Sequence, residues 1–222
     1  MTGIPSRPEG VSREEERRAL LISLGWTLIF LLLVSALLFR DTVFLDRSVA
    51  EIFSGLPSPV YVFFSIFCRS GNVEIELPVL FGLGWTLWRR RPETGRVLLF
   101  LAAVLVIGTL LEHLLKMHLP RYSPPAPFQH DTLPGWAVFF PVHFHVIASF
   151  PSGHTFRALL ILLMVRLLYP GAFFPVLLWS TGIIVGVIVL GWHWSSDAAG
   201  SAALVGIVWP WAGLMVRSIK KS

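Results

Sequence analysis

The chain has 222 residues, of which 55% are hydrophobic and only 14% are charged, and its mean hydropathy is +0.71. Such a composition is that of an integral membrane protein. The pI near 10 would suggest a nucleic-acid partner in a soluble protein, but the basic residues lie at the ends of apolar runs and act as topology signals, so we expect no nucleic-acid partner. The single cysteine, Cys68, excludes an intramolecular disulfide framework and a multi-cysteine metal site.

Six apolar runs are long enough to be membrane-spanning helices, since crossing a hydrocarbon core of about 30 Å needs about 20 helical residues. The first run is about twice as long as a signal-peptide core and lacks a small-x-small cleavage site, so we expect a retained span. Polar residues interrupt the second run, which fits either one long tilted helix or a broken one. The runs cover residues 19–39, 60–88, 97–115, 151–168, 173–191 and 197–216.

Two segments between the runs have a different character. Residues 40–58 mix charged and apolar side chains, which predicts an interfacial helix ended by a proline turn. Residues 119–149 contain six prolines and cannot be helical throughout. Loops of this length in a compact domain are usually functional or disordered, and the aromatic residues of this one favour a position on the membrane interface.

The distribution of Arg and Lys predicts how the spans are oriented. With six spans, the basic N-terminus shares the cytoplasmic side with one connection and with the C-terminus. The basic residues of these last two segments are Arg89, Arg90, Arg91, Arg96, Arg217, Lys220 and Lys221. Lys116, His154 and His193 then lie together on the extracytoplasmic side.

The sequence therefore predicts an all-α fold, a six-transmembrane-helix bundle with a long extracytoplasmic loop between the third and fourth spans. Residues 1–18 are expected to form a polar cytoplasmic tail, 19–217 a single transmembrane domain and 218–222 a basic cytoplasmic tail. The expected location is the cell membrane, with the chain crossing it several times.

The first candidate site is the start of the fourth run, where residues 151–155 read PSGHT. Here the backbone N–H groups of Ser152 and Gly153 fall in the first turn of a helix, where no intrahelical acceptor exists. These donors and the helix dipole form a seat for an anion such as phosphate. The alternative is that Ser152 only caps the helix and His154 is an interfacial histidine.

The second candidate site is the polar stretch before the sixth run, where residues 191–197 read GWHWSSD. The four-residue spacing lets the Asp197 carboxylate face the His193 imidazole. A carboxylate on one ring nitrogen sets the tautomer and leaves the other nitrogen available as a base or nucleophile. The alternative is an interfacial histidine beside an N-capping aspartate.

These motifs together resemble the type 2 phosphatidic acid phosphatase superfamily. The resemblance rests on PSGH at 151–154, on His193-x-x-x-Asp197 and on a preceding Lys116-x-x-x-x-Arg121. It covers roughly residues 40 to 215, and the combination is far more specific than any one motif.

The resemblance implies a six-span helical membrane enzyme that needs neither a metal nor another cofactor. By this resemblance His193 attacks phosphorus and forms a phosphohistidine, Asp197 orients it, and His154 protonates the leaving oxygen. Covalent catalysis of this kind needs a positioned nucleophile and a separate acid, which agrees with the local interpretation of the two motifs.

The chain departs from the family's pattern at two positions that usually carry phosphate-binding arginines. Seven residues after Lys116 it has Ser123, and six residues before His193 it has Val187. Substitutes are available in Arg121 and in Arg157, which lies three residues after His154 on the same helix face. Lys116 matches the family's lysine, but Glu112 one turn earlier offers it a structural ion pair instead.

The leading functional hypothesis is a membrane lipid phosphatase that acts on a lipid phosphate or diphosphate at the extracytoplasmic side. The expected catalytic residues are His154, His193 and Asp197, and the expected phosphate-binding residues are Lys116, Arg121, Ser152, Gly153 and Arg157. Two alternatives remain open. One is a lipid phosphotransferase similar to sphingomyelin synthases, whose phosphodiester substrates carry less charge and need fewer arginines. The other is a degenerate member that binds lipid without chemistry.

Overall fold

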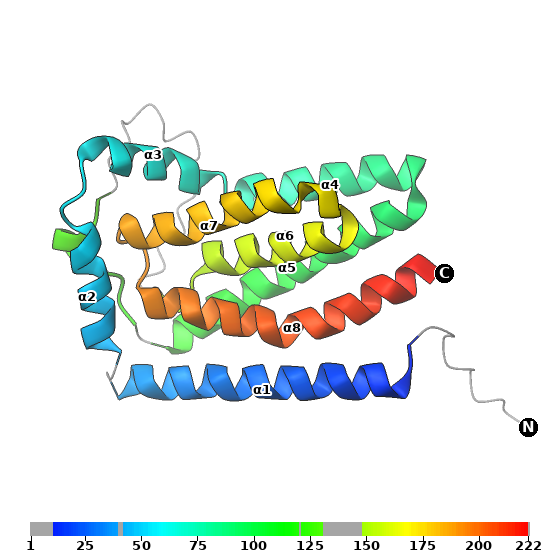
Figure 1. Ribbon diagram of the computed structural model, residues 1–222, viewed down its shortest axis with the longest axis horizontal. Helices are drawn as coiled ribbons and strands as arrows, with labels where there is room; N and C mark the ends of the chain where they lie inside the picture. Colours follow the sequence, from blue (N-terminus) through cyan, green and yellow to red (C-terminus); the bar gives the residue numbers. More distant parts are fainter. Residues whose placement is uncertain (1–10, 40–41, 120, 131–147, 222) are drawn as a thin grey trace, which may run out of the picture.

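The computed structural model describes residues 11–39, 42–119, 121–130 and 148–221, the side chains of 219–221 excepted. Within these ranges the chain forms eight α-helices, two short 3₁₀ helices and no β-strand (Figure 1). The predicted all-α class is confirmed for this part of the chain. The elements are α1 (Arg13–Leu38), α2 (Val43–Phe53), α3 (Ser58–Arg69), α4 (Val73–Arg90), α5 (Pro92–His118), η1 (Ala126–Phe128), α6 (Gly153–Leu168), η3 (Pro170–Ala172), α7 (Phe173–Val189) and α8 (Ser195–Lys221).

Local sequence explains where the first long helices begin. The Ser12 hydroxyl accepts a hydrogen bond from the Glu15 backbone N–H at 3.2 Å, and the Glu15 carboxylate accepts from the Ser12 N–H at 2.9 Å. This reciprocal capping box satisfies two donors that have no intrahelical partner. Pro92 occupies the first turn of α5, where its missing N–H is no loss. The charged N-terminal segment therefore continues as helix directly into the first apolar run.

Four helices are long and apolar enough to cross a membrane: α1, α5, α7 with η3, and α8. The pair α2 and α3 is bent by 115° and adds a fifth candidate if the pair counts as one span. The predicted spans that contain α4 and α6 are not among these candidates, because α4 carries four charged residues and α6 has only 16 residues. Most of the predicted long loop, residues 131–147, lies outside the described residues.

The surface of α1 is apolar, as the hydrocarbon interior of a bilayer requires. This helix packs along α8 and exposes most of its apolar side chains. The side chains with the largest exposed fractions include Leu21 (59%), Leu28 (59%), Leu31 (57%) and Leu32 (61%). Leucines arranged in this way around a long helix face hydrocarbon rather than water. The chain is a multi-pass membrane protein.

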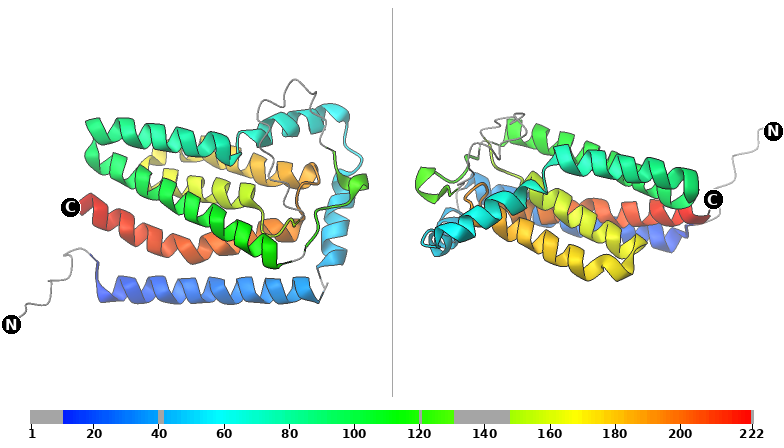
Figure 2. Two further views of the ribbon diagram at one scale, coloured as in Figure 1. Left: turned by 180° about the vertical axis from the view of Figure 1, so that it is seen from behind. Right: turned by 90° about the horizontal axis from the view of Figure 1, so that it is seen from above.

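The second apolar run is broken, as one of the two predicted alternatives had it. Residues 70–72 separate α3 from α4, and Figure 2 shows the two helices as distinct segments. The predicted interfacial segment contains α2, which crosses the end of the bundle rather than running along it (Figure 1). The end of the bundle that carries α2 and the α3–α4 junction therefore differs from the opposite end.

The two ends of the bundle are formed by different segments. The start of α1, the end of α8 and the α4–α5 connection lie at one end (Figure 1), where Arg217 lies 3.9 Å from Glu15. The start of α6 and the α7–α8 connection lie toward the other end, next to α2. One buried core of α1, α5, α6 and α8 side chains, including Leu101, Leu105 and Leu160, holds this arrangement together.

Candidate active site

The start of α6 is tied to α8 through Ser152. Its hydroxyl accepts from the Thr155 N–H at 3.3 Å, as expected for a helix N-cap. Its own N–H donates to the Asp197 carbonyl at 3.2 Å, and its carbonyl accepts from the Ser201 hydroxyl at 2.7 Å. The backbone donor that was expected to face an anion at this residue is thus already bonded within the protein. Gly153 is the next backbone donor along the chain.

Gly153 is in tight contact with an acidic side chain. A Cβ at this position would collide with the carboxylate of Glu112, which comes from α5. The close approach explains why the first residue of α6 is a glycine. It also places a carboxylate directly beside the predicted anion seat, which sequence reasoning treated only as a partner for Lys116.

The second motif lies where the chain turns from α7 into α8. Gly191 has a φ of +65°, and a side chain there would collide with the Phe128 carbonyl. After this turn, the N–H groups of Trp192 and His193 both donate to the Val187 carbonyl, at 3.0 and 3.1 Å. These two hydrogen bonds fix the position of His193 relative to the end of α7. Val187 itself is fully buried among apolar side chains.

The spacing of His193 and Asp197 does bring their side chains together. The Asp197 Oδ2 lies 3.5 Å from His193 Nδ1 and also accepts from the Trp194 N–H at 2.8 Å. Its other oxygen, Oδ1, lies 3.2 Å from Arg121 Nε. The Asp197 carboxylate is completely buried. Its contacts make it both the partner of the histidine and part of the N-terminal cap of α8.

The two histidines face one another across the α6–α8 boundary. The centroids of the His154 and His193 rings lie 6.3 Å apart, and the Trp192 ring lies 5.6 Å from His154. The His154 Nε2 is 2.9 Å from the side-chain oxygen of Asn72, at the α3–α4 junction. The structure thus gathers His154, His193 and Asp197 at one end of the bundle.

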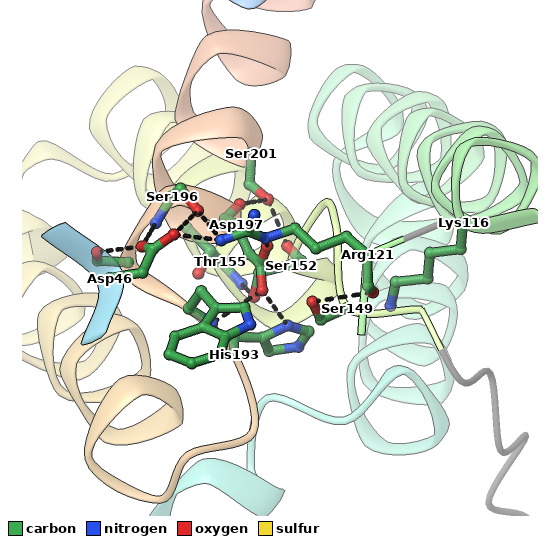
Figure 3. Close-up of polar contacts among 12 residues, drawn as sticks. Asp46, Lys116, Arg121, Ser149, Ser152, Thr155, His193, Ser196, Asp197 and Ser201 are labelled. Carbon is green, nitrogen blue, oxygen red and sulfur yellow. Dashed lines mark hydrogen bonds and ion pairs between the residues drawn. The ribbon is translucent and has the colours of Figure 1, made fainter. Parts of the chain in front are cut away.

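Arg121, Asp46 and Asp197 form what we call the His193 cluster. Figure 3 shows the Arg121 side chain reaching past Asp197 toward Asp46, to which it donates. It also donates to the Ser196 hydroxyl at 2.9 Å. Asp46 in turn accepts from the backbone N–H of Ser196 at 2.9 Å and from the Ser195 hydroxyl at 2.7 Å. An aspartate of α2 therefore neutralises Arg121 and caps the first turn of α8.

Arg157, Glu76 and Glu112 form what we call the His154 cluster. The Arg157 Nε lies 2.8 Å from the Glu76 carboxylate, and its Nη1 lies 3.6 Å from the Glu112 carboxylate. Its Nη2 donates to the Gly71 carbonyl at 3.1 Å. The other Glu112 oxygen accepts from Lys116 at 2.6 Å. Charges of alternating sign thus run from α4 through α6 to α5.

The cations near the histidines are balanced by acids. Lys116, Arg121 and Arg157 each have a carboxylate partner, and these partners are Asp46, Glu76, Glu112 and Asp197. The pairing limits how much positive charge the site presents to an anionic ligand. Among the described residues, no group of three His, Cys, Asp or Glu side chains is arranged to hold a metal ion.

Sequence reasoning missed three residues that contact this site: Asp46, Asn72 and Glu76. Each contact joins residues that lie far apart in the chain, as in the 82-residue separation of Asn72 and His154. A usable signal existed, because each of the three is a polar residue at an interruption of an apolar stretch. Such residues in a membrane protein normally have a partner inside the protein.

Two comparisons with known proteins bear on this arrangement. A family model described as the PAP2 superfamily matches residues 97–221. The fold is similar to the crystal structure of a transmembrane PAP2-type phosphatidylglycerolphosphate phosphatase from Bacillus subtilis, with a TM-score of 0.68 and 18% sequence identity over 90% of this chain and 96% of that one. No curated protein matched at the sequence level. Asp46, Asn72 and Glu76 precede the residues that the family model matches.

Proposed function

Because the chain belongs to the PAP2 superfamily, we propose that it is a membrane lipid phosphatase that hydrolyses a lipid phosphate or diphosphate through a phosphohistidine. One observation carries the proposal: two imidazole rings with centroids 6.3 Å apart, one of them beside a buried carboxylate. A nucleophile oriented by a carboxylate and a separate acid are what a two-step phosphoryl transfer needs.

In the first step the His193 Nε2 lone pair attacks phosphorus, and the bond from phosphorus to the lipid oxygen breaks. The lipid oxygen leaves with a proton from His154, so the lipid departs as an alcohol or as a lipid with one phosphate fewer. Asp197 holds the Nδ1–H of His193 and stabilises the positive charge that develops on the ring. In the second step water attacks phosphorus, His154 takes the water's proton, and the phosphorus–nitrogen bond breaks to release phosphate.

The residues proposed to bind the phosphoryl group are Lys116, Arg121, Ser152, Gly153 and Arg157. These residues differ in how far their donor groups are already bonded within the protein. The N–H of Ser152 is bonded to the Asp197 carbonyl, and both arginines are bound to carboxylates. We therefore assign the largest share of phosphate binding to the Gly153 N–H. Lys116, like the two arginines, has a carboxylate partner, Glu112, which lies against Gly153.

We also place this site on the extracytoplasmic face. The basic α4–α5 connection, the start of α1 and the end of α8 share the opposite end of the bundle (Figure 1), and positive charge marks the cytoplasmic side of a membrane protein. With α4 and α6 counted as the two remaining spans, residues 19–217 form a single six-span unit. The head group of the substrate would then reach the histidines from outside while its tail stays in the bilayer.

A second candidate function is lipid head-group transfer. The observation that favours it is the pairing of Arg121 and Arg157 with acids. A phosphodiester carries one negative charge and needs less positive charge in its site than a terminal phosphate. In this reaction the hydroxyl of a second lipid takes the place of water in the second step.

One assay separates the candidate functions. The purified protein in detergent would be offered phosphatidic acid, phosphatidylglycerophosphate and undecaprenyl diphosphate, each with and without a lipid alcohol. Release of inorganic phosphate supports the phosphatase, and transfer to the alcohol supports the transferase. Binding without turnover would contradict both proposals and leave a lipid-binding protein.

The nucleophile has its own test. His193→Ala should abolish turnover and the acid-labile, alkali-stable phosphoenzyme, while His118→Ala, an exposed histidine at the end of α5, should leave both unchanged. If the His193→Ala protein turns over substrate at the wild-type rate, the proposed mechanism is wrong.

A further inference from the structure

Asn72 uses its side chain in an unusual way. It stands at the N-cap of α4 with extended backbone angles, yet its side chain makes no capping hydrogen bond. Asparagine is among the most favourable N-cap residues, so a cap is its ordinary use at this position. Its amide oxygen instead lies 2.9 Å from the His154 Nε2.

The junction that carries Asn72 is fixed from two other helices. Arg157 of α6 donates to the Gly71 carbonyl at 3.1 Å, and Trp179 of α7 donates to the Ser70 hydroxyl at 2.9 Å. His154 and Arg157 are three residues apart and so share one face of α6. Two side chains of this face thus hold two consecutive residues, 72 and 71.

From this geometry we propose that Asn72 is a positioning residue for His154, which sets the orientation and the tautomer of its ring. The inference rests on the proposed function, in which His154 is the proton donor. An amide oxygen only accepts hydrogen bonds, so Nε2 carries a proton and Nδ1 becomes the nitrogen that exchanges a proton with the leaving oxygen and with water.

The surroundings of His154 make such an acceptor useful. The charged and titratable groups that act on the ring are Arg69 from α3, Lys116 from α5, Arg157 from α6 and His193 from the α7–α8 connection. All of them are cationic or can become so, and an oxygen acceptor on the ring is complementary to this positive environment. The oxygen of Asn72 accepts from Nε2 in both the neutral and the protonated ring, so the ring keeps one orientation through the reaction.

Two substitutions in the full-length protein separate positioning from capping. Asn72→Ser keeps an excellent N-cap residue but is too short to reach His154. It should lower kcat by about tenfold or more while KM stays within about twofold, because proton transfer and not binding is impaired. Asn72→Asp keeps the acceptor and adds a negative charge that favours the protonated ring. It should move the alkaline limb of the pH–rate profile about one unit upward.

A readout independent of turnover completes the test. In protein labelled with ¹⁵N-histidine, ring nitrogen shifts assigned with a His154→Gln sample should show the Nε2–H tautomer of His154 in the wild type and in Asn72→Asp, and its loss in Asn72→Ser. Wild-type shifts in Asn72→Ser would overturn the inference, as would an unshifted profile in Asn72→Asp. If the wild type turns over none of the lipids, the proposed function fails while the tautomer experiment still decides the role of Asn72.

Discussion

The His193 cluster and the His154 cluster share one plan and hold different parts of the molecule. In each, an arginine pairs with two carboxylates beside one of the two histidines. Arg121 joins α2 to the first turn of α8, whereas Arg157 joins α6 to the α3–α4 junction. Both arginines are thus bound to acids and connect helices, so they leave less positive charge for a phosphate than their number suggests.

The two clusters differ in whether a carboxylate contacts the histidine ring. Asp197 belongs to the His193 cluster and contacts the histidine itself. Among the residues that the structure describes, no carboxylate contacts the His154 ring, and the neutral Asn72 takes that position. This difference suits the proposed roles. His193 becomes positively charged as it attacks, which a carboxylate stabilises, whereas His154 must release its proton, which a neutral partner permits.

The largest effect is expected from Asp197→Asn, which breaks the contact that only one cluster has. The amide cannot hold the Nδ1–H tautomer of His193 as the carboxylate does, so kcat should fall by about a thousandfold or more. Steady-state phosphate release on the best lipid substrate measures it. A loss of less than tenfold would mean that Asp197 serves mainly as a cap for α8.

Asp46→Ala is expected to have the next largest effect, on stability. Removing this buried acid leaves Arg121 with one partner fewer and the start of α8 uncapped, at a cost of about 3–5 kcal/mol in the free energy of unfolding. Denaturation in detergent followed by tryptophan fluorescence gives the value. The double variant Asp46→Ala with Arg121→Met should recover part of the loss; strictly additive losses would show that the pair is not coupled.

Glu112→Gln tests whether the acids of the site limit the positive charge that is available to a phosphate. The substitution frees Lys116 from its ion pair while the side chain keeps its shape beside Gly153. KM for a lipid carrying a terminal phosphate should drop by roughly fivefold, which corresponds to about 1 kcal/mol. Glu51→Gln, at an exposed position of α2, serves as the control and should change nothing. An unchanged or raised KM in Glu112→Gln would contradict the proposal that acids limit phosphate binding.

The smallest effect is expected far from both clusters. Ser12→Ala removes the capping box of α1 and should lower stability by about 1 kcal/mol. Turnover should remain that of the wild type, because α1 begins at the opposite end of the bundle from the histidines. A change in kcat with unchanged stability would show that the two ends of the bundle are coupled.

Local patterns were sufficient for part of the fold and of the site. Apolar length located the long helices, and the polar residues within the second run left a break between α3 and α4 as one of two alternatives. The four-residue spacing of His193 and Asp197 brought their side chains together because the chain between them is one turn at a helix start. The expectation that Ser152 offers a free N–H did not allow for the Asp197 carbonyl, which lies 45 residues later in the chain.

Contacts between residues far apart in the chain could not be predicted from sequence patterns. Nothing near Arg121 in the sequence indicates Asp46, 75 residues away, and nothing near Arg157 indicates the Gly71 carbonyl. Both arginines were predicted to bind phosphate in place of the two arginines that the family usually carries, and Arg157 also because a buried cation requires an anion. In this structure acids within the protein meet that requirement.

Sequence patterns alone predict the membrane-protein class, the helical fold and the two histidine motifs, because hydropathy and helix-start signals act over a few neighbouring residues. The packing of the helices determines which charges are neutralised within the protein and which side chain contacts His154. Such pairings depend on how helices far apart in the chain pack together, and burial makes each pairing obligatory once the helices have met.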